Sequence, residues 1–102
     1  KNSKIKFEDS MIVSNEPGYY KENQYGIRIE NLILSKLSHG RITFKTITIA
    51  PFERLLIDQT LLTVHEIDWV NRYHKRVRKI LTPSMNSDEK DWLMSQTAPL
   101  RN

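Results

Sequence analysis

The spacing of apolar residues changes near Pro51, and this change constrains the fold more than any other feature of the sequence. Before Pro51, residues 25–34 and 41–50 alternate between opposite faces, which is the period of a β-strand. After it, residues 64–81 carry apolar side chains three or four positions apart, which is the spacing of one face of an α-helix. Strands followed by helices predict an α+β fold with antiparallel strands and two C-terminal helices.

Turn and capping residues set the expected ends of these elements. A short apolar strand at residues 11–13 is followed by Pro-Gly at residues 17–18, a strong turn signal. Thr63 followed by Glu66 is the pattern of a capping box and predicts the start of the long helix. Ser87, which precedes two acidic residues, is expected to cap a second and shorter helix.

Composition excludes several classes of protein. The chain has no cysteine, so it has no disulfide, thiolate zinc site or cysteine nucleophile, which fits a reducing, cytoplasmic location. It has no apolar run of about 18 residues, so no membrane partner is expected. The net charge of +4 is concentrated in residues 64–81, where cations complement the end of a helix. Without a binding motif beside it, this cluster does not predict nucleic-acid binding.

The chain begins Lys-Asn-Ser-Lys, with no initiator methionine and no segment that resembles a signal peptide. Three strands and two helices would also bury only a small two-layer core. We therefore expect the 102 residues to be the last part of a longer protein.

Glu16 and Glu30 are the residues most suited to metal chemistry. If residues 17–24 connect a hairpin, the two carboxylates come side by side at one end of a sheet, an arrangement that suits divalent metal ions. The competing interpretation is that each is a surface glutamate paired with Arg28 or Lys21. Spacing alone favours the surface interpretation, because two glutamates at this separation are not a motif.

Two sequence blocks carry a resemblance to a known family. EPGYY at residues 16–20 and GIRIEN at residues 26–31 resemble the end of the catalytic domain of Xaa-Pro aminopeptidases (aminopeptidase P), which are creatinase and methionine-aminopeptidase "pita-bread" metallopeptidases. One departure is Ser10, where the family usually has glycine. The resemblance continues through PFERLLID at residues 51–58, WVNRYH at residues 69–74 and TAPL at residues 97–100.

This resemblance implies a domain organisation and an activity. Residues 1–50 would be the C-terminal end of the catalytic pita-bread domain, and residues 51–102 the helical extension of the long aminopeptidase P type. The parent protein would be a metal-dependent hydrolase that releases the N-terminal residue from peptides with proline in second position. We also expect the full-length protein to be a homodimer.

The family's two-metal centre implies roles for four residues. Glu16 and Glu30 match two of five metal ligands, and Tyr20 and Arg28 match supporting positions that hydrogen-bond around the ligands. The ions would be manganese, with cobalt or zinc as alternatives. The other three ligands would lie upstream, so we expect the chain by itself to be inactive.

The three histidines, His39, His65 and His74, match no metal position, and His65 and His74 are expected to be packing or surface residues. Three other interpretations stay open. The chain could be a non-catalytic binding module with a pita-bread-like fold, part of a prolidase-type dipeptidase, or an assembly module in which residues 51–102 pack against a second copy.

Overall fold

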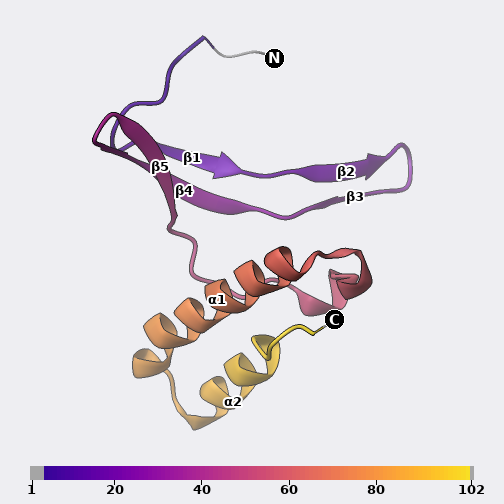
Figure 1. Ribbon diagram of the computed structural model, residues 1–102. Coiled ribbons are helices and arrows are strands. Elements are labelled where there is room, and N and C mark those ends of the chain that lie inside the picture. Colours follow the sequence, from indigo (N-terminus) through magenta and orange to yellow (C-terminus); the bar gives the residue numbers. More distant parts are fainter. Residues whose placement is uncertain (1–3, 102) are drawn as a thin grey trace. The chain divides into compact units, whose positions relative to one another are not determined.

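The computed structural model describes residues 4–101; residues 1–3, which open the chain, and residue 102 lie outside the described part. The chain divides between Thr48 and Ile49 into two compact units, which are described one at a time. The first unit contains strands only and the second contains the helices (Figure 1). The expected α+β fold, with antiparallel strands before two helices, is therefore confirmed.

Five antiparallel strands make up the first unit. β1, β4 and β5 form one sheet in the order β1-β4-β5, and β2 pairs with β3 in a second sheet. The strands span Ile12–Asn15 (β1), Gly18–Lys21 (β2), Tyr25–Arg28 (β3), Asn31–Ser38 (β4) and Arg41–Thr46 (β5).

The two sheets share one long ribbon. β1 and β2 run along one side of it and β3 and β4 return along the other (Figure 1). The last pair of the β1–β4 ladder is Asn15 with Asn31, and the first pair of the β2–β3 ladder is Gly18 with Arg28. The residue numbers of each pair have the same sum, so the register does not change across the break.

The prediction of a single strand at residues 25–34 is wrong in one respect, because the structure divides this segment between β3 and β4. The division lies opposite Pro17, which has no N–H to donate to a ladder. One backbone bond still crosses there, from the Ile29 N–H to the Pro17 carbonyl at 3.1 Å. The proline therefore interrupts the ladder without changing the path of the ribbon.

The strand expected at residues 41–50 is also shorter than predicted, because β5 ends at Thr46. Ile47 still donates its N–H to the Leu32 carbonyl at 2.9 Å. The N–H of Leu32, however, donates to the side-chain Oγ1 of Thr48 at 2.8 Å rather than to a backbone carbonyl. A side chain thus replaces the backbone acceptor, and the regular ladder stops.

The turn before β1 contains Ser10, the position where the family usually has glycine. Ser10 has a φ of 62°, in the left-handed region that favours glycine. Its N–H donates to the Ser35 carbonyl at 2.9 Å, and Asp9 Oδ1 accepts from the Leu37 N–H at 2.7 Å. Both bonds fasten this turn to β4.

Two helices dominate the second unit: α1 (Val64–Leu81) and α2 (Ser87–Gln96). The expected capping box at α1 is confirmed, since the Glu66 N–H donates to Thr63 Oγ1 at 3.2 Å and the Thr63 N–H donates to Glu66 Oε2 at 2.7 Å. Within the described residues, neither helix is both long enough and apolar enough to cross a membrane. Short 3-10 turns occupy Arg54–Leu56, Gln59–Leu61 and Thr82–Ser84.

The cap of α2 differs from the prediction. Asn86, not Ser87, is the N-cap residue, and its Oδ1 accepts the Glu89 N–H at 2.9 Å. Glu89 Oε2 accepts the Asn86 N–H in return, also at 2.9 Å. Both residue types cap helices well. Asn86 prevails because it stands three positions before Glu89, the spacing that a capping box requires.

The buried apolar side chains of the described residues all belong to the second unit. They form two clusters on the inner face of α1, and the partly buried Phe52 packs against both. Leu93 is the only α2 residue among them and is fully buried. The clusters are Ile67, Val70 and Leu100, and Tyr73, Val77 and Leu93.

His74 is a core residue, as expected for a histidine without a metal role. Its side chain is fully buried, and its Nε2 accepts the Phe52 N–H at 3.0 Å. Nδ1 has no hydrogen-bond partner. Burial, and then the charges of Arg78 and Arg54, lower the pKa of His74 below its usual value of 6.5.

The C-terminal tail is ordered against α1. Leu100 is 2% exposed, its N–H donates to Asn71 Oδ1 at 2.8 Å, and its carbonyl accepts from Asn71 Nδ2 at 3.1 Å. A single amide side chain therefore satisfies both backbone groups of the residue that the core buries.

Candidate metal-ligand face

Six alternating residues of the ribbon share one face, which we call the glutamate face. The β2–β3 register pairs Gly18 with Arg28 and Tyr20 with Gly26. Because the register is the same on both sides of the break, it also places Glu16 opposite Glu30. Side chains of a strand alternate between its two faces, so these three pairs lie on the same side. The glutamate face comprises Glu16, Gly18, Tyr20, Gly26, Arg28 and Glu30.

Arg28 is the electrostatic centre of this face. Its Nε lies 3.6 Å from Glu30 Oε2. A hydrogen bond with Tyr20, and then the charges of Glu30 and Glu16, raise the pKa of Arg28. Both glutamates therefore lie within electrostatic reach of one guanidinium.

The face is open rather than enclosed. A hollow of about 410 Å³ lies over it, lined by Tyr20, Gly26, Arg28 and Glu30. The side chains of Arg28 and Glu30 are about half exposed, at 52% and 43%. Both can therefore rearrange around an incoming group without first breaking a buried network.

Two opposed carboxylates match the oxygen donors that divalent metal ions prefer, so the residues fit part of a metal site. They do not fit a whole one. Among residues 4–101, no group of three or more His, Cys, Asp or Glu side chains is placed to hold an ion. A complete centre at this face would need donors from outside the described chain.

Sequence reasoning singled out four members of this face, Glu16, Tyr20, Arg28 and Glu30, and missed Gly18 and Gly26. The signal was present, because both glycines lie in the EPGYY and GIRIEN blocks at the same alternating positions as the four. Recognising it requires the cross-strand register, which cannot be read from one strand alone.

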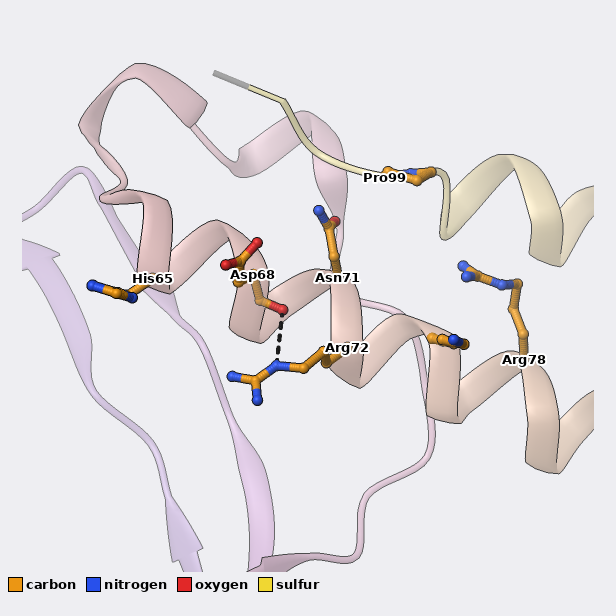
Figure 2. A pocket seen from close by; sticks show the side chains of 7 residues that line it. His65, Asp68, Asn71, Arg72, Arg78 and Pro99 are labelled. Carbon is orange, nitrogen blue, oxygen red and sulfur yellow. Dashed lines mark hydrogen bonds between the residues drawn. The ribbon is translucent and has the colours of Figure 1, made fainter.

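A second hollow, the basic groove, lies in the helical unit between α1 and the tail (Figure 2). It has a volume of about 560 Å³. Arg72 Nε donates to the Asp68 carbonyl at 3.4 Å, and Arg78 Nη1 donates to the Thr97 carbonyl at 2.6 Å. Its lining is His65, Asp68, Asn71, Arg72, Lys75, Arg78 and Pro99. Much of the basic cluster of the sequence thus lies along one exposed groove of α1.

Comparisons with known proteins agree on one group. A family described as the C-terminal region of peptidase M24 matches residues 40–100. Aminopeptidase P1 of Arabidopsis thaliana is 38% identical over 94% of this chain, and a probable Xaa-Pro aminopeptidase P of Coprinopsis cinerea is 41% identical over 88% of it. The chain covers 16% of each of these relatives.

A solved structure is similar as well. The X-prolyl aminopeptidase of Caenorhabditis elegans, described as a cytosolic enzyme with a di-nuclear active site, matches 92% of this chain with a TM-score of 0.77 and 34% sequence identity. The match covers 17% of that protein.

These findings define a class of protein, an α+β C-terminal segment of a peptidase. The chain belongs to the family of C-terminal regions of peptidase M24. The resemblance to aminopeptidase P that the two glutamate blocks carried is confirmed.

Proposed function

We propose that this chain is the C-terminal part of a metal-dependent Xaa-Pro aminopeptidase, and that Glu16 and Glu30 supply two carboxylate ligands of its two-metal centre. The observation that carries the proposal is the glutamate face, where an unchanged register sets the two glutamates opposite each other. The similarity to aminopeptidase P supports the same assignment.

Tyr20 and Arg28 act in support of the carboxylates. Arg28 lies beside Glu30 and within electrostatic reach of Glu16, so its guanidinium helps to orient both carboxylates. Tyr20 lies next to Arg28, with its hydroxyl and Arg28 Cγ both close to Gly18, and this restricts where the guanidinium can lie. A divalent metal pair, which we propose to be manganese, would supply Lewis-acid polarisation of the scissile carbonyl when bound.

We assign residues 1–50 to the end of the catalytic domain and residues 51–102 to a C-terminal helical extension. The division into compact units between Thr48 and Ile49 supports a boundary near this point. The substrates would be peptides with proline in second position. The complete protein would be cytoplasmic, and the solved relative is described as cytosolic.

Exposed apolar side chains support the proposal that the complete protein is a homodimer. Leu55 and Leu61, in the 3-10 turns before α1, are 89% and 79% exposed. Apolar groups this exposed are candidates for burial against another surface.

The proposal predicts a sharp difference between the chain and the protein that contains it. The complete protein, loaded with Mn²⁺, should release the first residue of an Xaa-Pro peptide and spare a control peptide with alanine in second position. The 102-residue chain under the same conditions should release none. Equal cleavage of both peptides by the complete protein would refute the assignment of substrate.

A further inference from the structure

We propose that Gly18 and Gly26 are positioning residues whose missing Cβ atoms form a cradle for the Tyr20 side chain, aiming its hydroxyl at Arg28 between Glu16 and Glu30. This inference deepens the proposed function and rests on it for its catalytic consequence. It assigns a purpose to both glycines of the EPGYY and GIRIEN blocks.

The aromatic ring of Tyr20 packs against the backbone of Gly26. The two residues are paired across the β2–β3 ladder. A Cβ on Gly26 would lie 2.6 Å from Cδ1 and 3.1 Å from Cε1 of the Tyr20 ring. The ring therefore lies directly over the Gly26 backbone, in space that any other residue would fill.

Gly18 leaves room for the hydroxyl and for the arginine. A Cβ there would lie 2.7 Å from Tyr20 Oη, 2.8 Å from Arg28 Cγ and 3.0 Å from the Ile27 carbonyl oxygen. Tyr20 and Arg28 together thus occupy the space that a side chain at position 18 would need.

A need for left-handed backbone does not explain these two glycines. Among the described glycines, only Gly40 has a φ in that region, at 76°, and a Cβ there would meet nothing within 4 Å. Gly18 and Gly26 lie in regular extended strands, where glycine is ordinarily unfavourable. The close approach of the Tyr20 side chain, which only glycine permits, explains why glycine stands at these two strand positions.

The cradle has a consequence for the two glutamates. With its ring over Gly26, Tyr20 places its hydroxyl beside Arg28, since Tyr20 Oη and Arg28 Cγ both approach the same position at Gly18. A displaced ring would release the guanidinium from its place beside the carboxylates. Gly26 thus acts on the metal ligands through Tyr20 and Arg28, without touching them.

A double-mutant cycle in the complete enzyme tests whether Gly26 acts through Tyr20. Gly26→Ala should lower kcat/KM about tenfold to a hundredfold, as is typical when support of metal ligands is lost. In a Tyr20→Ala background, where no ring remains to be displaced, adding Gly26→Ala should change kcat/KM by less than about twofold. Tyr19→Ala is the matched control, because Tyr19 lies on the opposite face of the same strand. In that background Gly26→Ala should keep its full effect.

The complete protein without metal provides a second readout that does not need activity. In an NMR spectrum, Gly26→Ala should move the Arg28 Nε–H resonance to the position that Tyr20→Ala gives it. A resonance left at the wild-type position would overturn the proposal, as would an equal loss of kcat/KM from Gly26→Ala with and without Tyr20.

The two readouts separate this proposal from the proposed function. If the complete protein cleaves no Xaa-Pro peptide, the proposed function fails. The Arg28 resonance then still decides whether the glycines position Tyr20.

Discussion

His74 links the stability of the helical unit to pH through one hydrogen bond. As a neutral imidazole, it accepts the Phe52 N–H at Nε2. A protonated imidazole has no free acceptor, and its charge would be buried near Arg54 and Arg78. The pKa of His74 is therefore lower in the folded state than in the unfolded chain. Between these two pKa values the unfolded state binds more protons, so stability is full above about pH 6.5 and falls as the pH falls below it.

Acidification should destabilise the helical unit. Between about pH 7.5 and 5.5, the free energy of unfolding should fall by at most about 1.4 kcal/mol, the limit that linkage sets for one histidine with an unfolded pKa near 6.5. Thermal melts followed by circular dichroism measure this change. His74→Gln, which keeps an acceptor but does not titrate, should flatten the dependence. His65→Gln, at an exposed histidine of the same helix, should leave it unchanged; an equal flattening by both variants would contradict the account.

The sequence predicted the site residues that carry a functional group and missed the site residues that do not. Glu16 and Glu30 carry carboxylates and lie in the EPGYY and GIRIEN blocks, so the sequence alone identifies them as candidates. Gly18 and Gly26 carry no functional group, and their value lies in the space they leave for Tyr20. That space depends on which strand positions face each other, a long-range property.

Among the elements, the start of α2 offers a clear test of local structure. Asn86→Ala should lower the free energy of unfolding by about 1 kcal/mol, because it removes the acceptor of the Glu89 N–H. Ser87→Ala removes no capping bond and should cost less than about 0.5 kcal/mol. Urea unfolding of both variants measures the difference. A larger loss from Ser87→Ala would return the cap to the position predicted from the sequence.

Most element types were predictable, but the strand β2 was not, because residues 17–24 were expected only to connect a hairpin. Element boundaries were also less predictable, for identifiable reasons. The capping box at Thr63 and the helical spacing after it are local signals, so α1 was predicted nearly in full. The division of residues 25–34 depends on Pro17 in the opposite strand, and the end of β5 depends on Thr48 as a side-chain acceptor. Partners distant in sequence set both boundaries, and single-strand patterns do not contain them.

At the scale of the whole molecule, the two units differ in how much of their apolar surface they bury. Among the described residues, every buried apolar side chain lies in the helical unit. The strand unit instead exposes large apolar groups such as Ile12, Leu32 and Phe44, at 61%, 44% and 45%. Open strand edges and exposed apolar area favour association.

The isolated chain should therefore self-associate. Multi-angle light scattering at increasing concentration should give a mass above the 12.1 kDa of one chain. Residues 49–102, prepared alone, should associate less, because they lack the strand unit. A strictly monomeric chain at all concentrations would contradict this expectation.

The central claim is that Glu16 and Glu30 bind metal in a complete Xaa-Pro aminopeptidase. The most direct measurement is the bound manganese per protomer of the complete protein, determined together with Xaa-Pro peptide cleavage, for Glu16→Gln, Glu30→Gln and the control Glu22→Gln. Glu22 lies in the exposed turn between β2 and β3 and shares the charge of the other two without their position. The account predicts two bound ions and full activity for the control, and fewer ions with activity lost for the other two variants. Unchanged metal content and activity in Glu16→Gln and Glu30→Gln would contradict it.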